Sequence, residues 1–130
     1  MGTPRITVIN DNPDFLELMG AILDDESGYE VRLLDGDETG LEELQETSPD
    51  LIIVDLLLGR ASGWELIALA RADATLREVP IIVCSADVNQ LRERAEELAD
   101  IGGVHMLKKP FAVDELTSLV DDLIGQPAGR

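Results

Sequence analysis

The stretch Leu51-Ile52-Ile53-Val54-Asp55 places a carboxylate directly after four consecutive apolar residues, three of which are β-branched. A continuous apolar run of this length is typical of a strand covered by helices on both faces of a parallel sheet. In such sheets ligands bind outside the carboxyl ends of the strands, which is where Asp55 would stand. The stretch therefore predicts the class of the fold and one residue of a functional site.

Similar short runs lie on either side of this strand, at residues 6–9, 31–34, 81–84 and 104–107. Between and after the runs, apolar residues recur with the spacing of a helix, as in Phe15, Leu18, Met19 and Ile22. Further helices are indicated around residues 41–44, 64–70, 91–98 and 116–123. Five alternations of strand and helix in 130 residues predict one α/β domain, a doubly wound parallel sheet with five helices. We expect this domain to span residues 1–124 and to be followed by a disordered tail at 125–130.

The chain is strongly acidic, with 27 Asp and Glu against 10 Lys and Arg and a formal net charge of −17. This balance argues against direct binding to nucleic acid or to an anionic membrane, which both require basic surface. The acidity is local, because residues 11–50 hold 14 acidic residues and one basic residue, Arg32. Two interpretations stay open: a solvated acidic face, or a docking surface for a basic partner.

Neither the cysteine content nor the search for targeting signals narrows the function further. The single cysteine, Cys84, cannot form an internal disulfide and is expected to fill its strand as a small apolar residue. The first apolar run is too short for a signal peptide, and no stretch approaches the roughly 18–20 apolar residues that span a bilayer. His105 has no acid or cysteine at ligand spacing, so we expect no metal there. A cytoplasmic protein is predicted.

The predicted strands end in polar residues of complementary chemistry. The first ends in Asn10-Asp11, the third in Asp55, the fourth in Ser85, and the fifth leads into Lys109. Two carboxylates close together suit a hard cation such as Mg²⁺, and an ammonium and a hydroxyl can donate to phosphoryl oxygens. An Asp carboxylate is itself a nucleophile that can form an aspartyl-phosphate. The set therefore suits phosphoryl transfer onto a carboxylate.

Each of these residues also has a structural alternative. Asp11 could favour a helix N-terminus, Ser85 could cap the following helix, and Lys109 could be an ordinary loop lysine. A flavodoxin-like cofactor binder is disfavoured, because the loop after the first strand has no glycine and its acidic residue would repel phosphate.

The sequence resembles the receiver domain of two-component response regulators over residues 5–124. Four stretches in the family's order carry the resemblance: residues 6–13 (ITVINDNP), 49–56 (PDLIIVDL), 62–66 (SGWEL) and 109–111 (KPF). The resemblance implies a flavodoxin-like fold with strand order 2-1-3-4-5. It also implies a phosphoacceptor in a two-component phosphorelay, whose own catalysis is limited to self-phosphorylation and slow autodephosphorylation.

The resemblance further assigns roles to individual residues. Asp55 would be the phosphoacceptor, with Lys109 and Ser85 acting on the phosphoryl group. Mg²⁺ would bind at Asp55, Asp11 and the Leu57 carbonyl, beside Asn10. The phosphoryl donor would be a sensor histidine kinase or a phosphotransfer protein. Phosphorylation would switch binding to a downstream protein, and the chain would be a monomer or a weak homodimer.

Three positions depart from the family pattern. Asn10 replaces the first of two acids after the first strand, which predicts weaker Mg²⁺ binding. Met106 replaces an aromatic switch residue, and Gly59 stands where proline is common. These departures keep a second hypothesis open, a degenerate receiver that is not phosphorylated and acts as a protein-interaction module.

Overall fold

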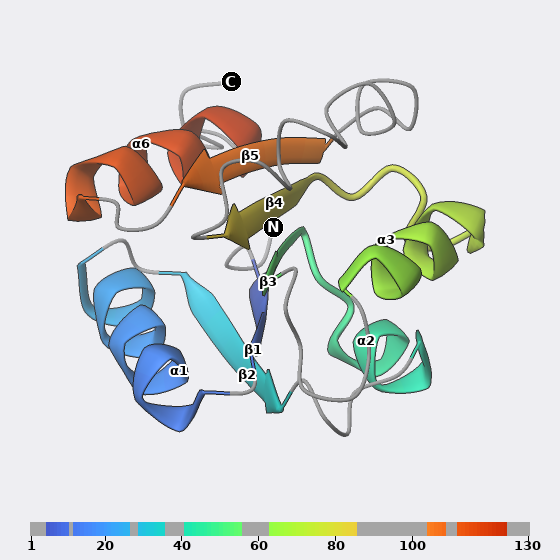
Figure 1. The fold of residues 1–130 in the computed structure, drawn as a ribbon, viewed down its shortest axis with the longest axis horizontal. Helices are drawn as coiled ribbons and strands as arrows, with labels where there is room; N and C mark the ends of the chain where they lie inside the picture. Colours follow the sequence, from blue (N-terminus) through green and yellow to red (C-terminus); the bar gives the residue numbers. More distant parts are fainter. Residues whose placement is uncertain are drawn as a thin grey trace.

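The structure is a computed structural model that describes residues 5–10, 12–26, 29–35, 41–55, 63–85, 104–108 and 112–124. Five strands form one parallel sheet in the order β2-β1-β3-β4-β5, which confirms the expected topology (Figure 1). The strands are β1 (Arg5–Asn10), β2 (Glu30–Asp35), β3 (Leu51–Asp55), β4 (Ile81–Ser85) and β5 (Val104–Lys108). Each strand contains one of the apolar runs seen in the sequence and extends beyond it by one or two residues.

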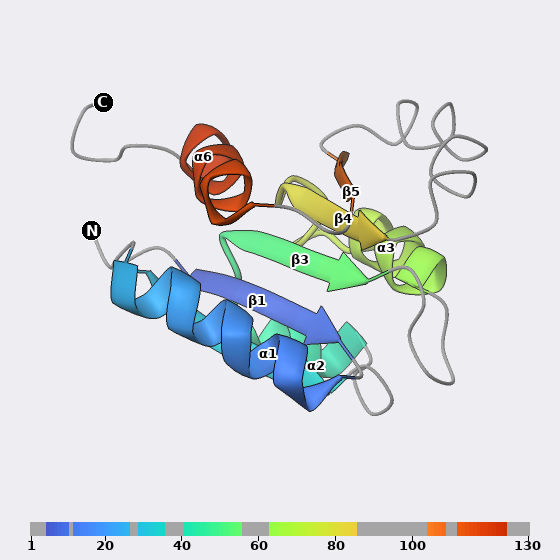
Figure 2. The ribbon, with the colours of Figure 1, turned by 60° about the vertical axis from the view of Figure 1, so that its left-hand side comes forward.

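Helices cover both faces of this sheet. They are α1 (Pro13–Gly20), continued by the π-helical segment η1 (Ala21–Glu26), then α2 (Leu41–Thr47), α3 (Gly63–Ala72) and α6 (Val113–Ile124). Figure 2 shows α1 and α6 on one face, with α2 and α3 on the other. The helix expected near residues 91–98 and the tail at 125–130 lie outside the described residues. Within the described part, no helix is long and apolar enough to cross a membrane.

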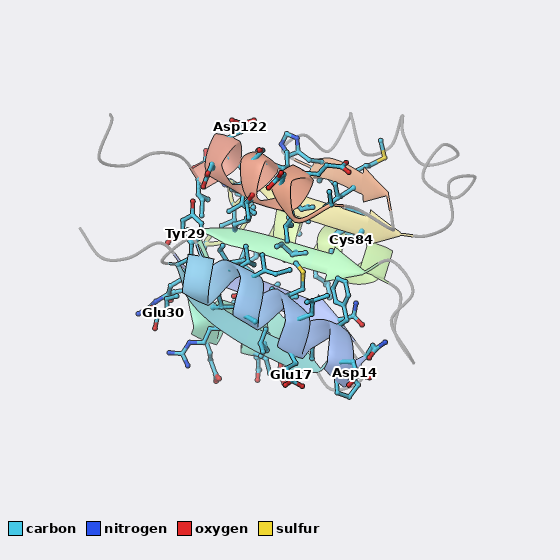
Figure 3. All side chains as sticks on the ribbon, turned by 90° about the vertical axis from the view of Figure 1, so that its left-hand side faces the viewer. Asp14, Glu17, Tyr29, Glu30, Cys84 and Asp122 are labelled. Atoms are coloured by element: carbon cyan, nitrogen blue, oxygen red, sulfur yellow. The ribbon has the colours of Figure 1, made fainter. Side chains whose placement is uncertain are left out.

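The core consists of two apolar layers that the sheet separates. Because side chains of a strand alternate between faces, Ile6 and Val8 pack toward α1 and α6, whereas Ile9 packs toward α2 and α3. Cys84 is buried in the α1/α6 layer, as the sequence predicted, and Figure 3 shows its sulfur between α1 and the sheet. The sheet is therefore a rigid platform with apolar support on both sides.

Helix α1 begins where the sequence predicts, but one residue expected on its apolar face is exposed. Asn12 is its N-cap, and the side-chain oxygen of Asn12 accepts from the N–H groups of Asp14 (2.9 Å) and Phe15 (3.4 Å). Met19 faces the sheet and is fully buried, yet Leu18 is 56% exposed although the helical spacing placed it on the apolar face. Consecutive residues of a helix point about 100° apart, so Leu18 lies beside the stripe centred on Met19 and Leu23.

The α3–β4 connection is organised around the carboxylate of Asp73. This carboxylate accepts from the N–H groups of Thr75 (3.0 Å) and Leu76 (3.2 Å), from the Thr75 hydroxyl, and from Nε2 of Gln45 (2.6 Å). The bonds from Thr75, with those from Gln45 and Leu76, hold the pKa of Asp73 below its ordinary value. A side chain of α2 and the end of α3 are thus joined at the amino end of the sheet.

Candidate functional site

The carboxyl ends of β1, β3 and β4 lie side by side at one end of the sheet. Ile9 is in register with Val54, and Asp55 is in register with Cys84, so Asn10, Asp55 and Ser85 end neighbouring strands at nearly one level. Neighbouring strands are about 4.8 Å apart. Figure 2 shows the arrowheads of these three strands at the same end of the molecule. The convergence that the sequence predicted is therefore present in the backbone for these three residues.

The side chain of Asn10 organises the start of the β1–α1 connection. Asn10 is only 2% exposed, and its Oδ1 accepts a hydrogen bond from the N–H of Asn12 at 2.8 Å. Asn12 in turn caps α1, so Asn10 and Asn12 together determine where the chain leaves β1 and enters the helix. Asp11 is the residue between them. Asn10 was expected in the metal site, as a neutral residue where the family has an acid. Its bond to Asn12 was not expected, although an Asn at the end of a strand is a signal for such a local bond.

Several predicted site residues lie outside what the structure describes. These are Asp11, Leu57, Gly59 and Lys109, together with the side chains of Asp55 and Ser85. Among the described side chains, no group of three or more His, Cys, Asp or Glu could hold a metal ion. His105 is partly buried on β5. The catalytic and metal-binding roles of the other residues stay predictions.

Met106, at the predicted switch position, lies on β5 beside Val83 of β4. Its side chain is 44% exposed, which is unusual for a large apolar residue of a strand. Val104, two residues earlier on the same face, is partly buried against the α2/α3 layer of the core. Met106 therefore presents flexible apolar surface next to the carboxyl end of β4.

Residues 6–121 match the family model of the response regulator receiver domain. The chain belongs to this family. The DNA-binding dual master transcriptional regulator RpaA of Synechocystis is 29% identical over 121 residues, which are 93% of this chain and 49% of that protein. Hybrid signal transduction histidine kinase D of Dictyostelium discoideum is 30% identical over 93% of this chain and 8% of its own length. The chain thus spans about half the length of its regulator relatives and a small part of the kinases.

Solved structures agree with this assignment. The receiver domain of a sensor histidine kinase from Pseudomonas aeruginosa, described with a magnesium ion coordinated in its active site cleft, is 29% identical with a TM-score of 0.79. The match covers 96% of this chain and all of that one. The chemotaxis response regulator CheY4 of Vibrio cholerae has a TM-score of 0.80 at 24% identity over 94% of this chain and 99% of its own, which shows a shared fold.

Membership in the family gives the chain its general role. It is a receiver domain of two-component signalling, a domain that occurs in both transcriptional regulators and histidine kinases among its relatives. Because the relatives include both kinds of protein, the family does not by itself define the partner of this chain.

Proposed function

We propose that the chain accepts a phosphoryl group on Asp55 from a phosphohistidine, in a Mg²⁺-dependent reaction in the cytoplasm, and that phosphorylation changes its binding to a downstream protein. The observation that carries this proposal is the place of Asp55, at the carboxyl end of the central strand β3 between strands that end in Asn10 and Ser85. Ligands bind at this edge in doubly wound sheets. The donor would be a sensor histidine kinase or a phosphotransfer protein.

The transfer is a substitution at phosphorus. An oxygen of the Asp55 carboxylate attacks, a P–O bond forms, the N–P bond of the phosphohistidine breaks, and the imidazole leaves with the electron pair. The Lys109 ammonium and the Ser85 hydroxyl would donate to the phosphoryl oxygens, where negative charge must be stabilised. Attack of water on the phosphorus later returns the free carboxylate and inorganic phosphate, so the chain turns over no separate substrate.

The chemistry of the available donors fits Mg²⁺. The carboxylates of Asp11 and Asp55, the Leu57 carbonyl and the Asn10 amide are all oxygen donors, which Mg²⁺ prefers. When bound, the ion would supply positive charge beside the phosphoryl oxygens. Asn10 contributes no net charge, and its Oδ1 already accepts from the N–H of Asn12. The binding of Mg²⁺ should therefore be weaker than with a carboxylate at position 10.

Intact-mass measurement after incubation with Mg²⁺ and acetyl phosphate tests this proposal. We expect a gain of one phosphoryl group, which disappears in Asp55→Ala and persists in Asp122→Ala, a control at an exposed carboxylate of α6. A gain that survives Asp55→Ala, or its absence from the unmodified chain, would overturn the assignment of Asp55.

A second function remains under test, in which the chain is a degenerate receiver that binds a partner without phosphorylation. Asn10 at the metal site and the exposed Met106 on β5 favour it. In that case partner binding would be the same in the unmodified chain and in Asp55→Ala, with or without the phosphodonor.

A further inference from the structure

An open pocket of about 500 Å³ lies at the amino end of the sheet, away from the end that carries Asp55. Pockets that bind small ligands usually measure about 300–1,000 Å³ and combine apolar surface with a few polar groups. This pocket is formed by the end of α2 and the α3–β4 connection, and its lining residues are Gln45, Ser48, Pro49, Thr75 and Leu76. Pro49 and Leu76 are buried and form an apolar floor. We call it the α2 pocket.

The backbone of Ser48 is strained in the wall of the α2 pocket. Its φ is 48°, and among the described residues other than glycine no other has a positive φ. The N–H of Ser48 donates to the Gln45 carbonyl (3.1 Å), which ends α2. Helices often end with one residue in this conformation, but it is usually glycine or asparagine. Strained residues of this kind cluster at ligand sites, which makes the pocket a candidate for one.

Hydrogen bonds to Asp73 orient the polar atoms of the α2 pocket. Nε2 of Gln45 donates to Oδ1 of Asp73 at 2.6 Å, and the Thr75 hydroxyl donates to Oδ2. A hydroxyl has one hydrogen to donate, so the Thr75 oxygen can only accept from a ligand, and Oε1 of Gln45 is an acceptor as well. The pocket therefore presents acceptors on two residues that both bond to one carboxylate.

The charge of Asp73 has no cationic partner among the described residues. The ion pairs of the described part lie on β1 and β2, and neither Arg71 nor Arg77 forms one with Asp73. Nη1 of Arg71 donates instead to the Leu76 carbonyl at 3.1 Å. The bonds that hold the pKa of Asp73 below its ordinary value come from neutral groups, with the Thr75 hydroxyl first. The α2 pocket thus adjoins a carboxylate that is ionised at neutral pH and hydrogen-bonded by neutral donors.

We propose that the α2 pocket binds a guanidinium group on an aliphatic stem, as in arginine. A guanidinium is planar and weakly hydrated, with five N–H donors and no acceptor. It would donate to the oxygens of Gln45 and Thr75 and be attracted by Asp73. Its flat face and its stem would rest on the apolar floor, which a compact and strongly hydrated ammonium suits less well. This site goes beyond phosphotransfer, because it does not require Asp55.

The probes are N-acetyl-arginine amide, its neutral isostere N-acetyl-citrulline amide, and N-acetyl-lysine amide. Each is titrated into the full ¹⁵N-labelled chain, and the shifts of the backbone amides and of the Gln45 side-chain amide are followed. We expect saturable shifts at Gln45, Ser48 and Thr75 with the arginine probe, and at least about tenfold weaker binding of the other two. Equal binding of the arginine and citrulline probes, or shifts that spread over the acidic helices and spare the pocket, would overturn the proposal.

Free arginine, compared with the blocked probe, distinguishes two sources of the guanidinium. Tighter binding of the free amino acid would identify the ligand as a small molecule. Equal or tighter binding of the blocked probe, which resembles a residue within a chain, would identify it as a side chain of a partner protein. Binding of neither would overturn the proposal.

Asp73→Asn tests the charge beside the pocket, and Glu78→Gln is its matched control, because it removes an exposed carboxylate of the same connection. We expect Asp73→Asn to weaken binding of the arginine probe about tenfold, and Glu78→Gln to change it less than about twofold. Equal weakening by both variants would show a general attraction to the acidic chain and contradict a specific site.

Gln45→Met keeps the proposal testable if Asp73→Asn does not fold. It preserves the length of the side chain and removes the amide from the pocket, so binding of the arginine probe should weaken as well. Asp55→Ala should bind the probe as the unmodified chain does, so a failure of phosphotransfer onto Asp55 leaves this test intact. Full binding in Gln45→Met, or its loss in Asp55→Ala, would contradict a guanidinium site in the α2 pocket.

Discussion

The hydroxyl of Tyr29 donates a hydrogen bond to Oδ1 of Asp121, joining the residue before β2 to the last helix across 92 positions of sequence. Tyr29 is 7% exposed and packs in the α1/α6 layer of the core. Burial, followed by the hydrogen bond and the charge of Asp121, raises the pKa of Tyr29 to about 12. Figure 3 shows Tyr29 between the ends of α1 and α6, and its bond to Asp121 ties α6 to the residue that precedes β2.

The raised pKa of Tyr29 predicts a loss of stability at high pH. A phenol whose pKa is higher in the folded state than its ordinary value of about 10 stabilises the fold fully below pH 10. That contribution is lost as the pH rises from about 10 through the folded value of about 12. Tyr29 is the single tyrosine of the chain, so the ultraviolet absorbance of tyrosinate titrates this group alone.

Tyr29→Phe is the matched variant for this prediction. It removes the hydrogen bond and keeps the buried ring, so we expect a loss of about 1 kcal/mol in the free energy of unfolding near pH 7. Urea unfolding at several pH values should also show less loss between pH 10 and 12 in the variant. A pKa of Tyr29 near 10 in the folded chain would contradict the bond.

The tie between Tyr29 and Asp121 also marks where prediction from sequence stops. The strands were predictable because each is a local apolar run, and Asp55 and Ser85 followed because each ends such a run. Asn12 and Pro13 were predictable as a helix start because the cap is local. A bond between residues 29 and 121 depends on two helices and a strand being in place, and no local pattern in the sequence encodes it.

Features that depend on how one element lies against another could not be predicted from the sequence. Spacing placed Leu18 on the apolar stripe of α1, but the axis of that stripe is set by where the helix rests on the sheet, and Leu18 lies outside it. Leu33 alternates correctly for a strand, yet its exposure follows from β2 being the outermost strand, which only the strand order decides. From the sequence, Asn10 was recognised as a neutral residue in place of an acid. Its bond to Asn12 could not be predicted, because it depends on the three-dimensional path of the chain.

Asn10→Asp should strengthen Mg²⁺ binding. The added carboxylate increases the negative charge around the cation, and we expect an affinity gain on the order of tenfold, measured by isothermal titration calorimetry. Without Mg²⁺ the same variant should be less stable, because neighbouring carboxylates repel at the carboxyl edge of the sheet.

The control for this variant is Asn10→Ala, which removes the buried acceptor of the Asn12 N–H. Leaving that donor without its partner should cost about 1–3 kcal/mol in unfolding free energy with or without Mg²⁺. If Asn10→Asp binds Mg²⁺ no more tightly than the unmodified chain, residue 10 does not belong to the metal site.

Asn12→Ala should destabilise the chain through the start of α1. The side chain of Asn12 accepts from the N–H groups of Asp14 and Phe15, and loss of such a cap costs about 1 kcal/mol. Asn12→Asp keeps an acceptor and adds a favourable charge at the helix N-terminus, so its stability should equal or exceed that of the unmodified chain. Equal loss in both variants, measured by urea unfolding, would show that the cap does not contribute.

The hydrogen bonds that Asp73 accepts from Gln45, Thr75 and Leu76 predict a loss of stability in acid. The pKa of Asp73 lies below its ordinary value, so these bonds stabilise the fold at a pH above that ordinary value. The contribution is lost as the pH falls through the folded pKa.

The bond from the Thr75 hydroxyl is the largest cause of the shift. Thr75→Val keeps the shape of the side chain and removes that donor, so it should raise the pKa of Asp73 toward its ordinary value. Carboxyl carbon shifts followed against pH measure this directly, with Thr117→Val on α6 as a control that should leave the Asp73 titration unchanged. A pKa of Asp73 that Thr75→Val does not raise would mean that the hydroxyl does not stabilise the carboxylate.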